Sequence, residues 1–229
     1  MLHHTKGVVI NYIKYRETSI IVRIYTAAFG MQSYIVNGAR STKSKGKIAL
    51  YQPLTLIDLV VYHKPNKDLH RISEAKCAIP FTSIPFDPIK TGITIFLTEI
   101  FGKTLRHEAT NERFFEFLFN AISIFDRLDK NVENFHIQIL LKSSTYLGFK
   151  PESEADFNQQ LIEKGLPSSL SSSDYQLLLD LLNLNLGQDI LITNKSRRDI
   201  LNHVIRYFRV HIESLGDIKS LEILKEVLY

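Results

Sequence analysis

The stretch IPFTSIPFDPIKTGITIFLTEIF, residues 79–101, separates two patterns of apolar residues. Before it, apolar residues alternate with a period of two, and beyond it they recur about every 3.6 residues. Its three prolines interrupt both patterns, because proline lacks a backbone N–H and fixes φ. The stretch therefore predicts a domain boundary, with a β domain at 1–80 and an α-helical domain at 81–229.

Upstream of this boundary the chain is rich in Val, Ile, Thr and Tyr, the residues that favour strands. Five strands are expected, at 6–15, 19–26, 31–37, 54–62 and 69–76. In the second strand Ile20, Val22 and Ile24 fall on one face, so the opposite face, with Arg23 and Tyr25, is free to meet a ligand. Five short strands predict a small barrel.

Downstream, apolar stripes predict helices. One stripe runs from Ile89 to Phe101 and the next from Phe114 to Phe125. Further helices are expected at 134–147, 173–182, 197–215 and 218–228, and the serine-rich tract 168–173 is predicted to be a loop. The predicted fold class is α+β multidomain, with a five-stranded β-barrel followed by an all-α domain.

Composition narrows the class of protein. The chain is 45% hydrophobic and 23% charged, as in globular proteins, and contains no apolar run long enough to cross a bilayer. The first residues lack the apolar segment of a signal peptide, so we expect a cytoplasmic protein without a membrane partner. Cys77 is the only cysteine, which excludes an internal disulfide.

Charge is distributed unevenly along the chain. Residues 1–80 hold 12 Lys and Arg against 4 Asp and Glu, a net charge of +8. The remaining residues hold 16 basic and 20 acidic side chains, a net charge of −4. A basic module joined to a mildly acidic one predicts that the first part binds a polyanion.

The run NGARSTKSKGK at 37–47 has four cations and no acid. Its small residues allow the backbone to follow a nucleic acid, and its cations can displace counterions from phosphates. A solvated flexible loop explains the charge run equally well. The position between two predicted strands favours binding through Arg40, Lys43, Lys45 and Lys47.

Tyrosines alternate with cations on the first three strands. A tyrosine ring can stack on a base without reading its identity, a contact of about 1 to 3 kcal/mol. For Tyr12 and Tyr34, packing inside the barrel is the favoured interpretation. Tyr25 is the better stacking candidate because it shares a strand face with Arg23. Lys14 and Arg16 complete the predicted binding residues.

The sequence lacks the patterns of an active site. No HExxH, CxxC or Walker pattern occurs, and the eight histidines are scattered. We therefore predict no enzyme, no metal and no cofactor. The arginines of 197–215 either extend a DNA path or pair with nearby acids, and the sequence favours neither.

An ordered set of short motifs resembles the RecO family of recombination mediators. The motifs are GVV at 7–9, YRETS at 15–19, GAR at 38–40, KSK at 43–45, LYQP at 50–53, YLGFKP at 146–151 and KSLEIL at 219–224. The resemblance implies an OB-fold ahead of the helical domain. It also implies a protein of DNA repair that binds and anneals single-stranded DNA without catalysis.

The resemblance further implies partners: RecR, the acidic C-terminal tail of single-stranded DNA-binding protein, and indirectly RecA. A tail that is acidic and apolar needs a groove with cations at its rim. Arg113, Arg127, Lys142 and Tyr146 are the candidates, although Tyr146 fits ordinary helix packing equally well. Many relatives carry a four-cysteine zinc site after the YLGFKP position. Residues 151–170 contain no cysteine, so we expect an insertion without zinc.

One alternative belongs to a different functional class. An RNA-binding OB-fold adaptor, with a helical domain that docks a protein, would share the basic barrel. A strong preference for RNA through 2′-hydroxyl contacts would favour it.

Overall fold

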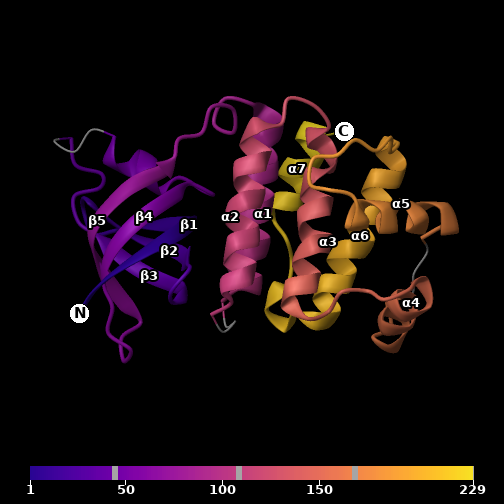
Figure 1. Ribbon diagram of the computed structural model, residues 1–229, viewed down its shortest axis with the longest axis horizontal. Coiled ribbons are helices and arrows are strands. Elements are labelled where there is room, and N and C mark those ends of the chain that lie inside the picture. The colour runs from indigo at the N-terminus through magenta and orange to yellow at the C-terminus, as the bar shows by residue number, and fades with distance from the viewer. Residues whose placement is uncertain (43–45, 107–109, 167–169, 229) are drawn as a thin grey trace.

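The computed structural model describes residues 1–42, 46–106, 110–166 and 170–228. Five strands come first in the chain, and seven α-helices follow them (Figure 1). The strands are β1 Leu2–Tyr15, β2 Ser19–Thr26, β3 Gly30–Val36, β4 Leu56–Tyr62 and β5 Leu69–Ile79. The helices are α1 Pro88–Thr104, α2 Glu112–Arg127, α3 Phe135–Leu147, α4 Glu154–Glu163, α5 Ser172–Asn183, α6 Asn194–His211 and α7 Ser220–Leu228.

The five strands form a closed barrel in the order β1-β2-β3-β5-β4. All neighbours are antiparallel except β3 and β5, which are parallel. A five-stranded Greek-key barrel of this kind is the OB architecture. The predicted fold class, an OB-like barrel followed by a helical domain, is confirmed.

The barrel interior follows from the period of two. Ile20, Val22 and Ile24 of β2 point inward and are fully buried. Gly7 leaves room for the Ile24 side chain in the interior, since a Cβ there would lie 2.6 Å from Ile24 Cγ2. An irregularity between Val9 and Asn11 then shifts the register of β1, as a β-bulge does.

One side of the barrel is covered by the helices. Val8, Ile10 and Tyr25 form this side, which we call the outer wall, and each is at most 1% exposed. They belong to the same apolar core as the helices, and the outer wall faces α1 and α2 (Figure 1). The barrel and the helices, which meet at the boundary predicted at residue 80, therefore share one core. Their division into two domains stays a prediction.

The segment between β5 and α1 is fastened to α2 by Asp126. The Asp126 carboxylate accepts hydrogen bonds from the backbone N–H groups of Thr82, Ser83 and Ile84 at 2.8 to 3.0 Å. Burial opposes its ionisation, but these hydrogen bonds outweigh burial and lower the pKa of Asp126. Lys90, also buried, donates to the backbone oxygen of Asp126 at 3.0 Å. We call this arrangement the linker clamp.

The predicted element positions agree with the structure where periodicity was strong. Strand 19–26 is predicted with its observed bounds, while β1 begins four residues earlier and β5 ends three residues later than expected. The predicted helix 197–215 is α6 followed by a short 3-10 helix, Glu213–Leu215. Helix α4 was not predicted. In the parts of the chain that the structure describes, no helix is long and apolar enough to cross a membrane.

Candidate nucleic-acid interface

Next to the outer wall, the barrel carries a strand surface that extends beyond the edge of the helices. Cross-strand pairing places Ile13, Ile21, Ile35 and Arg71 in one row over four strands. The neighbouring row contains Arg23, Ser33 and Leu69. These seven residues alternate with the barrel core, and we call their surface the open face. Ile13 is 61% exposed and Leu69 is 39% exposed, so apolar and cationic side chains meet water together.

Tyr25 does not belong to the open face. Its ring lies 5.9 Å from the rings of both Phe114 and Phe115 of α2, and its hydroxyl donates to Asn111 O at 3.4 Å. The side chain is only 1% exposed. The prediction that Tyr25 stacks on a base is wrong, because the docked helices cover the strand face on which it lies.

Arg40 is directed at the protein backbone rather than at solvent. Its guanidinium donates to Arg16 O at 2.8 Å, to Glu17 O, and to Ser19 O at 3.4 Å. All three acceptors lie in or beside the β1–β2 loop. The structure thus gives Arg40 a role in holding that loop, and its direct contact with phosphate stays a prediction.

Three other predicted cations are exposed at the margin of the open face. Lys14 and Arg16 lie at the end of β1 and just beyond it, with the Arg16 guanidinium 5.2 Å from the Tyr15 ring centroid. Lys47 donates to Asn37 O at 3.2 Å and lines the same hollow as Arg71. Lys43 and Lys45 lie outside the described residues. Binding by these cations stays a prediction.

The β4–β5 loop adds cations that the sequence interpretation did not select. Lys64 and Lys67 line a hollow with Leu69 and Arg71, beside the open face. The segment HKPNK at 63–67 carried the signal, since two lysines flank a turn between two predicted strands. Loops at this position and after the first strand border the ligand face in OB-folds.

An aromatic stack holds the β4–β5 loop on the barrel. The His63 ring stacks on Phe29 at 4.0 Å and on His70 at 4.5 Å between centroids. Burial lowers the pKa of His63, and the electrostatic effect of the neighbouring His3 acts in the same direction. Burial likewise lowers the pKa of His70, assisted by His63. Both rings are therefore neutral at pH 7, and the stack carries no repulsion between them.

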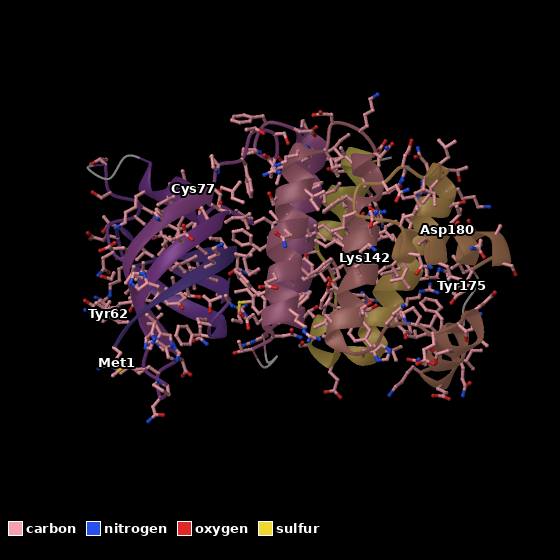
Figure 2. All side chains as sticks on the ribbon, viewed as in Figure 1. Met1, Tyr62, Cys77, Lys142, Tyr175 and Asp180 are labelled. Carbon is pink, nitrogen blue, oxygen red and sulfur yellow. The ribbon has the colours of Figure 1, made fainter. Side chains whose placement is uncertain are left out.

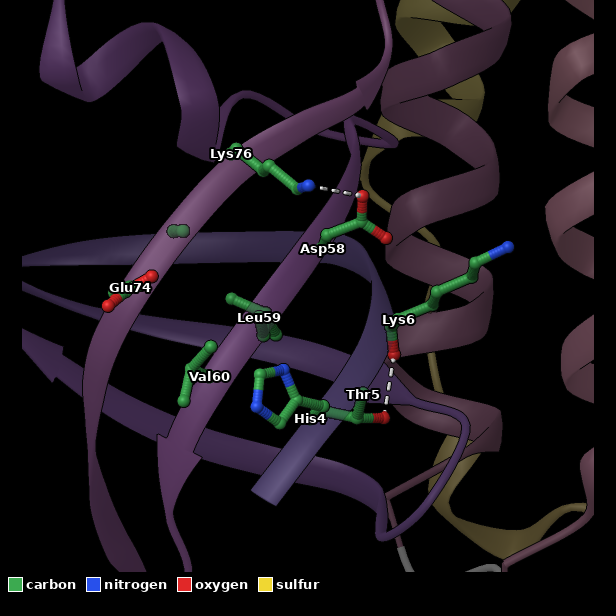
Figure 3. Close-up of a pocket in the computed structure, with 9 residues that line it drawn as sticks. His4, Thr5, Lys6, Asp58, Leu59, Val60, Glu74 and Lys76 are labelled. Carbon is green, nitrogen blue, oxygen red and sulfur yellow. Dashed lines mark hydrogen bonds and ion pairs between the residues drawn. The ribbon is translucent and has the colours of Figure 1, made fainter. Parts of the chain in front are cut away.

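The opposite face of the barrel has a different character. A hollow of about 640 Å³ over β1, β4 and β5 places Lys76 3.8 Å from Asp58, beside Glu74 and Lys6 (Figure 3). Acids and bases alternate here, so their charges largely cancel. This balance of charge differs from that of the open face, which is bordered by the cations of the loops after β1 and β4.

The four candidates for an acidic-tail groove do not all lie together, and the groove stays a prediction. Arg113 and Arg127 lie near opposite ends of α2, about 21 Å apart at 1.5 Å per residue. Lys142 lies within the helical domain and donates to Leu182 O at 2.8 Å (Figure 2). Tyr146 stacks on Phe117 at 4.8 Å and remains 37% exposed. The Asn111 side chain, at the start of α2, donates to Tyr146 O. Of the two arginines, Arg113 is the one that lies at this end of α2.

Within the predicted insertion 151–170, the described residues 154–163 form helix α4. Ser153 caps the helix by accepting from the Asp156 N–H, and Phe157 and Leu161 are fully buried. Phe157 stacks on Tyr207 of α6 at 4.6 Å. Packing against α6 thus holds this segment in place. Among the described residues, no three His, Cys, Asp or Glu side chains are grouped to hold a metal ion.

Comparison with known proteins places the whole chain. The family model "Recombination protein O N terminal" matches residues 1–81, and "Recombination protein O C terminal" matches residues 85–222. A protein named DNA repair protein RecO from Flavobacterium psychrophilum is 39% identical over 97% of this chain and 98% of its own length. Proteins of the same name from Bacteroides fragilis and Christiangramia forsetii are 35% and 34% identical, each with 99% of both chains covered.

Proposed function

Since this chain belongs to the Recombination protein O family, we propose that it binds single-stranded DNA on the open face of its barrel and anneals complementary strands. The observation that carries the proposal is the open face itself. It combines exposed aliphatic side chains with Arg23 and Arg71, and the cationic loops after β1 and β4 border it.

The mechanism needs no catalytic group. Cations at the rim replace the counterions of the phosphates, which supplies affinity without regard to base sequence. The aliphatic row of Ile13, Ile21 and Ile35 offers a flat apolar surface to unpaired bases. A strand held with its charge neutralised meets a complementary strand with less repulsion. Annealing then proceeds without nucleotide hydrolysis, and the protein acts as a mediator rather than an enzyme.

We propose the remaining roles from the family. With RecR, the protein helps to load RecA onto strands coated by single-stranded DNA-binding protein, in the cytoplasm at the nucleoid. For the acidic tail of the coating protein, we propose the exposed edge of Tyr146 and Phe117 with Arg113 nearby. Apolar rings beside a cation are the groups that an acidic tail ending in an aromatic residue requires.

A fluorescence strand-annealing assay with matched variants tests the function. The test variant carries Lys14→Gln with Arg71→Gln on the open face. The control carries Lys6→Gln with Lys76→Gln on the opposite face, for the same change in net charge. We expect slower annealing from the test variant only. Its log-log salt slope for single-strand binding should fall by about 1.4, at about 0.7 per lost phosphate contact.

Two outcomes contradict the proposal. Equal loss in both variants means that net charge alone drives binding and that the open face has no special role. Tighter binding of an RNA oligonucleotide than of DNA with the same sequence favours the RNA-binding adaptor instead.

A further inference from the structure

A second basic hollow lies where the barrel meets the end of α1. It has a volume of about 780 Å³ and is lined by residues of both units, including Arg23 and Ser33 of the barrel, Lys67 of the β4–β5 loop, and Arg106 just beyond α1. The units approach closely here, since a Cβ on Gly30 would lie 3.5 Å from Thr110 Oγ1. We call this site the seam hollow.

Two arginines from different units meet in the seam hollow. Arg23 extends from β2 and donates to Gly102 O of α1 at 3.3 Å. Burial lowers the pKa of Arg23, and the nearby positive charge of Arg106 lowers it further. Within the described residues, neither arginine forms an ion pair. Two like charges brought together in this way repel each other unless an anion lies between them.

The other groups around the hollow leave it positive. Among the described residues that line it, Asp68 has the only acidic side chain, against Arg23, Arg106 and Lys67. His63 and His70 also line it, and both are neutral at pH 7 because burial lowers their pKa. Ser33 adds a neutral hydroxyl. A planar guanidinium fork can donate to two oxygens of one phosphate group, and a second cation nearby adds to the attraction for that anion.

The seam hollow is also continuous with the open face. Arg23 and Ser33 are cross-strand partners on the open face, and both line the hollow. A polynucleotide bound at Arg23 and Ser33 on the open face would therefore lie beside the hollow. Past Arg23, the next cation on this route is Arg106, which belongs to the helical part of the chain.

We propose that the seam hollow is a phosphodiester subsite, in which Arg23 and Arg106 grip one phosphate of a bound strand and extend its path from the barrel onto the helical domain. The inference rests on the proposed function, because it concerns the same strand. It adds that DNA binding bridges the two units, so that their relative position affects affinity.

The test compares Arg106→Gln with Arg127→Gln. Both arginines are exposed, and Arg127 lies at the far end of α2 from the hollow. Binding of a short oligo-dT is measured by fluorescence anisotropy across a salt series. For Arg106→Gln we expect a slope smaller by about 0.7 and an affinity about fivefold lower near 0.1 M salt. Arg127→Gln should match the wild type. An Arg106→Gln variant with wild-type slope and affinity overturns the subsite and leaves the proposed function standing.

If the wild type does not bind oligo-dT even at low salt, the proposed function is refuted. A second measurement then tests the seam hollow by itself. The side-chain Nε–Hε resonances of Arg23 and Arg106 are followed by NMR during titration with inorganic phosphate. Shifts of both resonances at low millimolar phosphate, absent at Arg127, support an anion site in the hollow. Unmoved resonances overturn it. Arg23→Lys provides a further check, because it keeps the charge but loses the fork, and it should weaken binding in both experiments.

Discussion

Arg40 illustrates how a single cation can serve a binding loop without touching the ligand. Its guanidinium donates hydrogen bonds to three carbonyl oxygens around the β1–β2 loop. Without Arg40, these oxygens would need water or other donors. Lys47 of the same charge run is exposed to solvent. A charge run read from sequence therefore mixes cations that bind the protein with cations that face solvent.

Arg40→Lys separates the two roles. Lysine keeps the charge but cannot donate to three carbonyls in the geometry of a guanidinium. We expect Arg40→Lys to lower the free energy of unfolding by roughly 1 to 2 kcal/mol, from the lost hydrogen bonds. Single-strand affinity should fall with it, because the loop loses its position. Urea denaturation and fluorescence anisotropy measure the two effects. Wild-type affinity in Arg40→Lys together with lost affinity in Arg40→Ala would show that Arg40 contacts phosphate directly.

His136 is a buried titratable residue in the helical core. It is fully buried, and burial, followed by the positive charge of Arg197, lowers its pKa to about 3, opposed only by a contact with the backbone of Glu133. Between pH 6.5 and 3 the unfolded chain binds a proton at this residue and the folded chain does not. Stability therefore falls as pH drops through this window.

His136→Leu removes that pH dependence. Between pH 7 and pH 5, the unfolding free energy of the wild type should fall by roughly 2 kcal/mol more than that of the variant. Urea denaturation at both pH values measures the difference. An unchanged difference between the two proteins would mean that the folded state accepts the proton, which contradicts the burial of the ring.

At the scale of elements, α7 depends on a close approach to α1. Gly92 of α1 leaves room for Val227, since a Cβ at Gly92 would lie 2.5 Å from Val227 Cγ2. Glu99 accepts from Ser220 N at 2.8 Å and from Lys219 N at 3.1 Å at the start of α7. Burial opposes the charge of Glu99, but hydrogen bonds from Ser220, Lys103 and Lys219 outweigh it and lower its pKa to about 2.

Gly92→Ala is expected to displace α7. The added methyl group meets a stiff β-branched side chain, an overpacking that costs roughly 1 to 3 kcal/mol. Hydrogen exchange should become faster in α7 and stay unchanged in the barrel. Adding Val227→Ala should restore most of the loss, because it removes the clashing methyl groups. Failure of the second substitution to restore stability would place the strain elsewhere.

Elements with strong periodicity were predictable from the sequence, and those formed by tertiary contacts were not. The bounds of 19–26 follow from its alternation alone. Helix α4 has only two buried residues, Phe157 and Leu161, and its other face is polar, so the pattern was too weak. Its capping residue, Ser153, was the available signal.

The candidate site was predictable in part for a related reason. Alternation places Arg23 and Tyr25 on the same side of β2, but it does not say where the helices dock. The helices cover Tyr25 and leave Arg23 at the edge of the contact. Residues such as Arg71 and Arg106 enter the site only through strand pairing and interdomain packing, which a local pattern does not encode.

At the scale of the whole molecule, the shared core and the linker clamp join the two units. The apolar core that contains Val8 and Ile10 of the barrel also contains the helices. Asp126 fixes the connecting segment to α2 through three backbone N–H groups. The barrel and the helices should therefore unfold together in one transition.

The substitutions Asp126→Ala and Asp126→Asn test this coupling, because they remove different numbers of hydrogen bonds. Alanine leaves the N–H groups of Thr82, Ser83 and Ile84 without an acceptor, and we expect a loss of about 2 to 4 kcal/mol. Asparagine keeps one oxygen for Ser83 and Ile84 but turns its amide toward Thr82, so an intermediate loss is expected. Denaturation followed by circular dichroism and by tyrosine fluorescence measures stability and coincidence of transitions. Wild-type stability in both variants would show that the linker clamp does not stabilise the fold.

The outer wall also has a consequence for biosynthesis. The ribosome releases the barrel strands before it has made the helices that cover Val8, Ile10 and Tyr25, and α2 ends only at Arg127. Translation proceeds at roughly 5 to 20 residues per second, so this apolar surface stays exposed to solvent for seconds on every nascent chain. We therefore expect chaperones to bind the nascent barrel. Slower translation beyond residue 80 should favour aggregation.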